Sequence, residues 1–434
     1  MSDILMYLTK EHSPSDTLLL QDNPWMASNK TVIWSLSENR MDIEQISSDA
    51  AVQNGAGGII SVSISPNDFW TLASDAPWLK VSTTSGKKGR RKFTVTTYAN
   101  MTDTVRTGAV SLSSGGSSST LVIRQRPYIF YRREMAEADI VNALRLRSEG
   151  TEFTRVYSIL PIPVSNLYQD ISNISAIKKG REFICPDGVN HYLVTDIDER
   201  DIPQTGGEAA AEYFHIKVYE VAANLSHIKD IPAYDPDSEE CRLYLGKEDG
   251  DYVDPFYPEI AELADRLWNE TSGKLIAYAR ACFDWTAQNL TYGNAAHMGL
   301  QKMDFVMRNK ITDCSNFASV FISLLRAKGI PARHVSVISP WLKKDIDREH
   351  SRAEFYIPAY GWIPADPTHQ NGNPNGEHFA LFNGRYVVMT RGINLILRGP
   401  DKTDDKVNSL SCRYWYWYST GGRGVKFVHE FSFQ

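Results

Sequence analysis

Hydrophobic residues recur at helical spacing in the segment from residue 312 to residue 331. The apolar positions fall at i, i+3, i+4, i+7 and i+8, and they are Phe317, Val320, Phe321, Leu324 and Leu325. This period of 3.6 residues predicts a helix that is buried along one face. Gly329 and Pro331 predict its end, because glycine accepts the left-handed C′ conformation and proline cannot continue a helix.

The cysteine at the start of this helix is the first candidate for chemistry. Thr312 or Asp313 can accept hydrogen bonds from the free N–H groups of the first turn, which places Cys314 within that turn. The positive end of the helix dipole favours the thiolate form of such a cysteine. A lone cysteine is by itself more often a small buried hydrophobic residue, so the interpretation depends on its partners.

Two later segments have the pattern of strands and supply those partners. Apolar and polar residues alternate from His350 to Ile357, and a second short strand in WIPADPT carries Asp366. Antiparallel neighbours can place the imidazole beside the carboxylate, which then fixes the ring tautomer and stabilises the imidazolium. The other ring nitrogen can take the proton of a thiol that a packed helix presents. The sequence therefore predicts a triad of Cys314, His350 and Asp366.

The three blocks around these residues resemble the transglutaminase-like superfamily of papain-type thiol enzymes. They read DCSNFASVFISLLRAKGIPAR, HSRAEFY and GWIPADPT, and the resemblance extends more weakly through residues 258–293. It implies a C-terminal α+β, papain-like core. Two positions depart from the pattern: Thr312 stands where many relatives have glycine, and Arg352 where many have tryptophan. We expect both to affect the shape of the cleft more than the triad.

The segments next to the triad carry weaker signals. Two amphipathic helices are expected at 258–269 and 274–293, and Tyr292 can either line the cleft or pack in the core. A loop between residues 294 and 310 would frame the substrate channel. His369 and His378 lie in a polar loop and are expected to be exposed, so neither a metal nor another cofactor is predicted.

Alternating β-branched runs, separated by clusters of Gly, Ser, Asn and Asp, predict a small β-sandwich over residues 41–127. Their order resembles a BACON domain, a carbohydrate-associated module of Bacteroidetes, and the matching positions are Trp70, Trp78, Asn100, Arg106 and Gln125. We expect both tryptophans in the core rather than at a sugar site. The basic residues between 87 and 92 are expected to form a solvated hairpin end. Carbohydrate binding by this domain would rest on the family association alone, because these residues do not indicate it.

The expected organisation is multidomain. Residues 1–40 are strand-like and unassigned, 128–150 form a charged and partly helical connector, and 151–250 form a second β-rich domain. The latter ends in an acidic, polar loop. Residues 251–434 form the catalytic domain, with closing strands that include the aromatic run 415–418. That run can be a sugar platform or part of the core.

Composition excludes some classes of protein. The chain has 434 residues with 42% hydrophobic and 23% charged residues, which suits several globular domains. A formal charge of −6 does not suggest a nucleic-acid partner, and no apolar run has the length of a membrane span. The five cysteines have no CxxC spacing, so no zinc cage is expected. Cys282 falls in the core phase of its helix. The resemblance implies a periplasmic, cell-surface or secreted location, with a signal removed.

The leading functional hypothesis is a cysteine protease or amidase that forms a thioester acyl-enzyme. Cys314 attacks the carbonyl carbon, His350 acts as base and then as acid, and Asp366 orients His350. The backbone N–H of Cys314 supplies one oxyanion donor. The partner would be a peptide or protein, with glycan or glycoprotein reached through the N-terminal domain. The alternatives are a catalytically idle scaffold that binds glycan or peptide, acyl transfer to an amine, and a glycan-releasing amidase. A second oxyanion donor, disulfide pairing and oligomeric state stay open.

Overall fold

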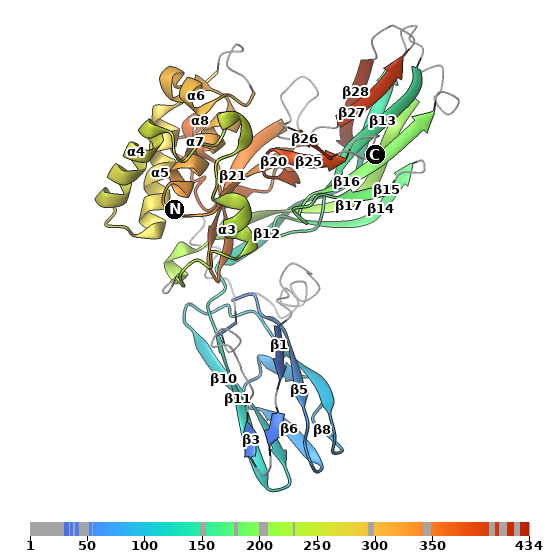
Figure 1. Ribbon diagram of the computed structural model, residues 1–434, viewed down its shortest axis with the longest axis vertical. Coiled ribbons are helices and arrows are strands. Elements are labelled where there is room, and N and C mark those ends of the chain that lie inside the picture. The colour runs from blue at the N-terminus through green and yellow to red at the C-terminus, as the bar shows by residue number, and fades with distance from the viewer. Residues whose placement is uncertain are drawn as a thin grey trace. The chain divides into compact units, whose positions relative to one another are not determined.

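The computed structural model divides into two compact units, Met1–Ile129 with Asn224–Ile231 and Phe130–Ala223 with Pro232–Gln434 (Figure 1). The residues it describes are 30–33, 35–37, 40–42, 52–53, 55–147, 153–177, 181–198, 207–228, 231–293, 299–341, 349–398, 404–407, 415–420 and 426–433. Among these, no helix is long and apolar enough to cross a membrane.

The first unit is built from two sheets, as the alternating runs predict. One sheet has the order β1 (Lys30–Ile33), β5 (Gly58–Ile64), β9 (Arg91–Thr97), β7 (Leu79–Val81). The other has the order β4 (Val52–Gln53), β11 (Ser117–Gln125), β10 (Arg106–Ser114), β6 (Trp70–Ser74), β8 (Ser85–Gly86). β2 (Ser35–Ser37) and β3 (Arg40–Asp42) form a separate pair. β1 joins β5 in parallel, so part of the unassigned segment 1–40 belongs to this unit; residues 1–29 lie outside the described residues.

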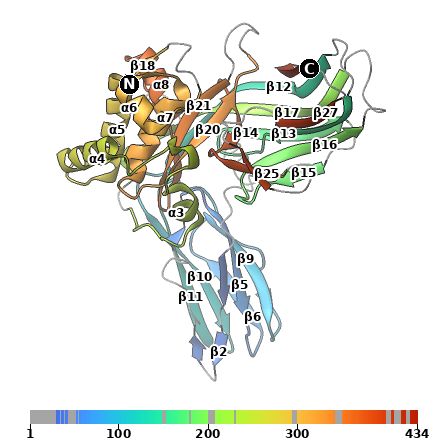
Figure 2. The ribbon, with the colours of Figure 1, turned by 45° about the horizontal axis from the view of Figure 1, so that its top comes forward.

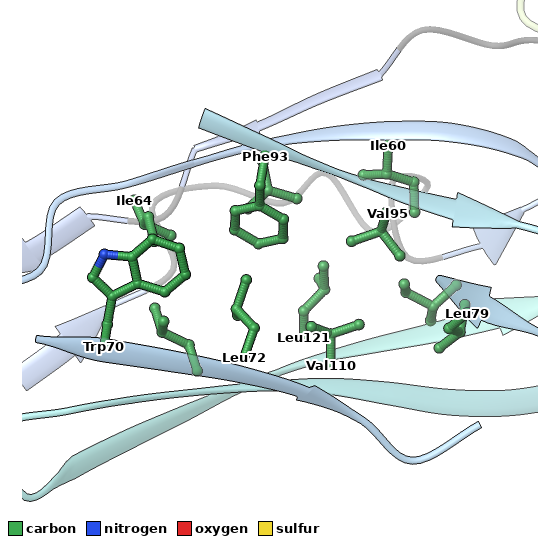
Figure 3. Packing of buried hydrophobic residues seen from close by; sticks show 12 residues of the cluster. Ile60, Ile64, Trp70, Leu72, Leu79, Phe93, Val95, Val110 and Leu121 are labelled. Atoms are coloured by element: carbon green, nitrogen blue, oxygen red, sulfur yellow. The ribbon is translucent and has the colours of Figure 1, made fainter. Parts of the chain in front are cut away.

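The core of this unit lies between the sheets, where apolar side chains from both point toward one another (Figure 3). Trp70 is 2% exposed, and its Nε1 donates a hydrogen bond to the carbonyl of Lys87 at 3.1 Å. Trp78 packs against the same cluster, and the Arg106 guanidinium lies 4.3 Å from its ring. Both tryptophans therefore serve packing, as predicted. The basic residues 87, 88 and 90–92 are exposed, also as predicted.

Two further sheets open the second unit. The first has the order β14 (Gln169–Ile177), β17 (Gly207–Ala223), β12 (Phe130–Arg147), β28 (Lys426–Phe433), with β23 (Leu381–Asn383) also paired to β17. The second has the order β15 (Arg181–Ile184), β16 (His191–Asp198), β13 (Phe153–Ile162), β27 (Trp415–Thr420). β25 (Leu395–Arg398) and β26 (Asp404–Val407) form a separate short pair, which precedes β27 in the sequence.

The expected connector at 128–150 is wrong in its helical part, because β12 is a strand through residues 130–147. It pairs antiparallel with β17 and with β28. Its charged residues face charged residues of β17, for example Arg133 and Glu220 at 2.8 Å. A run rich in Ala, Glu, Leu and Arg favours a helix locally, but pairing with distant strands decides its conformation.

The aromatic run at 415–418 and the strand after it belong to these sheets rather than to the core that carries the triad. β27 pairs with β13, and β28 pairs with β12. The contacts therefore do not divide the chain at residue 251: the strands of 130–223 and the segment from residue 232 onward form one unit. The side chains of residues 415–418 lie outside the described part of the chain, so the sugar-platform alternative stays open.

The core that carries the triad has a four-stranded antiparallel sheet with helices against it. The strand order is β22 (Gly361–Ala365), β21 (Glu349–Ile357), β20 (Ala332–Ile338), β24 (Val387–Arg391). The helices are α3 (Glu239–Tyr244), α4 (Pro258–Glu270), α5 (Leu275–Asn289), α6 (Met303–Asn309), α7 (Cys314–Arg326) and α8 (Pro367–Gly372). α4 to α8 gather on one side of β20 and β21 (Figures 1 and 2). The short pair β18 (Thr291–Tyr292) and β19 (Ile311–Thr312) precedes α7.

The helix predicted from the hydrophobic stripe is α7, but it is buried on all sides rather than on one. Every residue from Ser315 to Arg326 is buried, because α4, α5, α8, β20 and β21 all pack against the helix. Its polar residues find partners inside the core; the Ser323 hydroxyl, for example, donates to the carbonyl of Ser319 at 2.7 Å. This satisfies groups that would otherwise be costly to bury.

Two segments expected to be loops contain short helices. α3 lies within the acidic segment before residue 250, where the Ser238 side chain caps it by accepting from the N–H of Cys241. α6 lies within the segment 294–310, where Met303, Val306 and Met307 are buried at helical spacing. Both helices are short, so a polar surrounding sequence conceals their periodicity.

Candidate active site

Asp313 sets the position of Cys314 by capping α7. Its Oδ1 accepts the N–H of Ser315 at 3.1 Å, and its carbonyl accepts those of Asn316 and Phe317 at 3.2 and 3.1 Å. The N–H of Cys314 has no acceptor among the described residues. The first turn therefore presents a partly exposed thiol together with one free backbone donor.

Thr312 has a structural role just before the cap. Its hydroxyl, 1% exposed as a residue, accepts a hydrogen bond from Asn316 Nδ2 at 2.7 Å. The same amide group donates to the carbonyl of Gly299 at 2.8 Å. The Thr312 hydroxyl and the Asn316 amide thus tie the start of the helix to the preceding segment.

His350 and Asp366 meet because they lie on or beside paired strands. β21 carries His350, and Asp366 follows β22 directly as the N-cap of α8. His350 Nε2 lies 2.9 Å from Asp366 Oδ2, while Asp366 Oδ1 accepts the backbone N–H of His369 at 3.0 Å. The cap fixes one carboxylate oxygen and leaves the other for the imidazole. His350 Nδ1 is then the ring nitrogen left for Cys314.

The charges of the pair strongly favour imidazolium and carboxylate. Burial would lower the pKa of His350, but the charge and hydrogen bond of Asp366, together with a hydrogen bond to Cys314, outweigh it and raise the pKa to about 10. Burial would raise the pKa of Asp366, but the charges of His350 and Arg352 outweigh it and lower the pKa. Such stabilisation of the charged forms is what a thiolate–imidazolium mechanism requires.

Arg352 contacts the candidate triad directly, which corrects the expectation that it affects the shape of the cleft more than the triad. It is 1% exposed, and its Nε lies 3.1 Å from Asp366 Oδ2 in an ion pair. Its Nη2 donates to the carbonyl of Leu381 at 2.7 Å, and the guanidinium lies over the Phe382 ring. The alternation on β21 places residues 350 and 352 on the same face of the strand, which is the signal that could have found it.

His369 also belongs to the site; its side chain is 30% exposed, so the expected solvent exposure is only partial. Its ring stacks on that of His350, with centroids 4.6 Å apart and planes at 11°. Its Nδ1 lies 3.2 Å from Asp366 Oδ2, and the Tyr386 hydroxyl lies 3.4 Å from its Nε2. Burial lowers the pKa of His369 to about 4, helped by the positive charges of His350 and Arg352 and opposed by Asp366. It is therefore neutral near pH 7, and its Nδ1 lies next to Asp366 Oδ2.

Other residues expected near the site fall at its edges. Tyr292 is 44% exposed and pairs in register with Thr312, two residues before the cysteine, which favours the cleft over the core. His378 is half-buried, and its ring packs edge-on to that of His369. Residues 294–298 of the expected channel loop lie outside the described residues.

The donor atoms of His350, Asp366 and His369 lie within 4.8 Å of one another, close enough for one metal ion to bridge them. However, Arg352 already places a buried positive charge 3.1 Å from the same carboxylate oxygen. That charge disfavours a further cation, so the geometry suits proton transfer better than metal binding.

Cys314 differs from the other cysteines that the structure describes. Cys185, Cys241 and Cys282 are buried, whereas Cys314 is partly exposed. Burial raises the pKa of Cys282 to about 12, and burial also raises that of Cys185. Cys282 lies in the core, as predicted. Cys412 lies outside the described residues.

A thiol at a helix N-terminus, followed in the chain by a strand-borne imidazole and a capped carboxylate, is the arrangement of papain-type thiol enzymes. Residues 261–367 match the family model of the "Transglutaminase-like superfamily". Residues 68–126 match the BACON family, described as "Putative binding domain, N-terminal". The chain thus carries a transglutaminase-like core and a BACON region, and both predicted resemblances are confirmed over these residues.

Several proteins are similar to parts of the chain. The uncharacterized protein YebA of Bacillus subtilis is 33% identical over 82 residues, which are 16% of this chain and 11% of that protein. An uncharacterized protein of Haemophilus influenzae is 26% identical over 134 residues, 25% of this chain and 35% of that protein. The chain therefore spans about a tenth and about a third of these two relatives.

A solved structure is similar over a larger share of the chain. It is the crystal structure of "a Putative Cysteine Protease from Cytophaga hutchinsonii", with 15% identity and a TM-score of 0.41. The similarity covers 69% of this chain and 93% of that chain.

Proposed function

We propose that this protein is a cysteine hydrolase that cleaves an amide bond, with peptides as its substrate class. The observation that carries the proposal is that His350 is hydrogen-bonded both to the Cys314 thiol and to Asp366. The match of residues 261–367 to the transglutaminase-like superfamily supports it. The match of residues 68–126 to BACON supports a location outside the cytoplasm.

The reaction begins when the thiolate of Cys314 attacks the carbonyl carbon, while His350 holds the thiol proton on Nδ1. The negative charge that develops on the carbonyl oxygen is stabilised by the free N–H of Cys314. His350 then donates its proton to the leaving amine, which breaks the C–N bond and leaves a thioester. A water molecule, deprotonated by His350, hydrolyses the thioester and restores the thiol.

Asp366 keeps the imidazole in place during both proton transfers. Three groups approach its Oδ2: His350 Nε2 at 2.9 Å, Arg352 Nε at 3.1 Å and His369 Nδ1 at 3.2 Å. Arg352 and His369 act as positioning residues, because they hold the carboxylate and keep it ionised. The stack of His369 on His350 limits rotation of the catalytic ring.

The idle-scaffold alternative would be favoured by a missing member of the triad, and none is missing. Acyl transfer to an amine uses the same thioester and differs from peptide hydrolysis in the second substrate, which is an amine instead of water. Release of a glycan is also hydrolysis and differs in the leaving group, which is a glycan-bearing amine. Hydrolysis is preferred because Cys314 is partly exposed, which gives water access to the thioester.

The test is cleavage of a diverse peptide library, read by mass spectrometry, for the native chain and for Cys314→Ala and Cys314→Ser. We expect cleavage by the native chain and its loss in both variants at unchanged melting temperature. His191→Ala is the matched control, because it removes a histidine that pairs with Glu182 outside the site. Cleavage that survives Cys314→Ala would place the chemistry elsewhere. If no form cleaves a peptide, and the native chain and Cys314→Ala bind peptide or glycan equally well, the protein is a non-catalytic scaffold.

A further inference from the structure

A cavity lies in the same unit as the candidate triad, and none of Cys314, His350 and Asp366 lines it. Its volume is about 220 Å³. Its walls come from the turn after β15, the end of α3, Glu248 and the segment that links β24 to β25. This is smaller than the roughly 300–1,000 Å³ of pockets for drug-sized ligands, so it fits a molecule of few atoms.

One wall carries a buried guanidinium group whose ion pair is long. Arg391 is 6% exposed, and its Nε has no hydrogen-bond partner among the described residues. Its nearest carboxylate, that of Glu354, lies 3.7 Å away and is shared with Arg333 at 3.0 Å. Two buried guanidinium groups therefore share one buried carboxylate, which leaves one positive charge.

Acceptors occupy other parts of the wall. Asn394 is 6% exposed; its Nδ2 donates to the carbonyl of Asp249 at 3.1 Å, while its Oδ1 has no donor among the described residues. Asp187 adds a carboxylate, which the Asn190 side chain holds at 2.6 Å. The other acidic residue of the lining, Glu248, is neutralised by Arg326 at 3.0 Å. A buried acceptor without a donor calls for a ligand or water that supplies one.

The rest of the lining is apolar and includes Leu243, Leu395 and Ile396. The small cavity therefore combines a cationic donor, a carboxylate near an acceptor that has no donor, and an apolar wall. This combination matches one class of molecule. We propose that this cavity binds a free α-amino acid with an apolar side chain. Its carboxylate contacts Arg391, its ammonium contacts Asn394 Oδ1 and Asp187, and its side chain contacts the apolar wall. The proposal does not depend on the proposed hydrolase activity.

The experiment is isothermal titration calorimetry on the full chain carrying Cys314→Ala, so that no peptide is cleaved. The probes are L-leucine, L-leucinamide without the carboxylate, 4-methylpentanoate without the ammonium, and the dipeptide Gly-Leu. We expect L-leucine to bind, and each of the other three to bind at least about tenfold more weakly, because each lacks a charged group on the leucine α-carbon; in Gly-Leu the leucine nitrogen is a neutral amide and the ammonium lies on the glycine. Gly-Leu bound as tightly as leucine would overturn the proposal, because an ammonium on the leucine α-carbon would then have no role.

Variants test the wall residues. Arg391→Met should weaken leucine binding by about tenfold or more, and Leu243→Trp should abolish it by filling the cavity. Leu243 is 39% exposed, so this second variant keeps the test valid even if Arg391→Met unfolds. Arg385→Met, at an exposed position outside the lining, is the matched control and should bind normally. Absence of leucine binding by the parent chain, or equal binding by Leu243→Trp, would overturn the proposal.

Discussion

At the scale of single residues, three side chains contact the same oxygen atom of the site, Asp366 Oδ2. The nearest nitrogen atoms of His350, Arg352 and His369 lie 2.9, 3.1 and 3.2 Å from this oxygen, and Asp366 is 0% exposed. A carboxylate buried without such partners would be protonated at neutral pH. Each partner is therefore coupled to the ionisation of the others, and substitutions at this point should change pH profiles as well as rates.

Asp366→Asn should lower the pKa of His350, because the charge of Asp366 is the main influence that raises it to about 10. The alkaline limb of the kcat/KM profile should move to lower pH. The rate should fall by up to about 10⁴-fold, the loss seen when a serine triad loses its carboxylate. Asparagine can still cap α8, but it leaves the buried charge of Arg352 without its carboxylate, so the melting temperature should also fall. An unshifted alkaline limb would contradict the assignment.

Arg352→Met should lower the free energy of unfolding by about 1–3 kcal/mol, because it leaves a buried charged acceptor with one partner fewer. If Arg352 positions Asp366, kcat should fall while KM stays nearly constant, and Arg352→Lys should restore part of kcat. The measurements are urea unfolding and steady-state kinetics, with exposed Arg385→Met as control. A change in KM alone would show that Arg352 acts on the cleft instead.

At the scale of secondary-structure elements, the first turn of α7 determines which thiol reacts. The cap by Asp313 and the hydrogen bond to His350 set Cys314 apart from buried cysteines whose thiol pKa is raised, such as Cys282. A helix N-terminus next to an imidazolium is the environment in which cysteines become nucleophilic.

Iodoacetamide should therefore alkylate Cys314 much faster than Cys185, Cys241 or Cys282 in the folded chain. Peptide mapping after timed labelling measures the rates. Labelling in urea is the control, because unfolding should remove the difference. Similar rates for Cys282 and Cys314 under native conditions would argue for a structural thiol.

The sequence predicts local elements well and distant partners poorly. The period of α7, the strand that carries His350 and the cap by Asp313 depend on neighbours in sequence, and the structure has all three. The composition of β12 favours a helix locally, whereas its strand conformation depends on β17 and β28, which lie far along the chain. His369 has no periodic pattern, and its contact with His350 depends on how α8 packs. Arg352 could have been found from its position two residues after the histidine.

At the scale of the whole molecule, buried histidines link folding to pH in opposite directions. Burial lowers the pKa of His334 to about 3 and that of His369 to about 4, whereas that of His350 is raised to about 10. The unfolded chain titrates these groups near 6.5. Below that pH the unfolded chain binds protons on His334 and His369 that the folded chain does not bind, so the free energy of unfolding falls as the pH falls. Above it the folded state keeps a proton on His350 that the unfolded state loses, so stability falls with rising pH.

The unit that contains the triad should therefore be most stable near pH 6.5. Urea titrations followed by tryptophan fluorescence from pH 4.5 to 9 measure this. Asp366→Asn should flatten the alkaline side, because it removes the cause of the raised His350 pKa. A stability that still rises between pH 7 and 9 would contradict the assignment.

The pairing of β27 with β13 and of β28 with β12 has a consequence for biosynthesis. A ribosome completes β12 and β13 early, but their partners emerge only after most of the chain's length has followed. At about 5–20 residues per second, edges of both strands stay unpaired for on the order of tens of seconds. Unpaired edges invite aggregation, so the nascent chain has a long interval in which a chaperone would protect it.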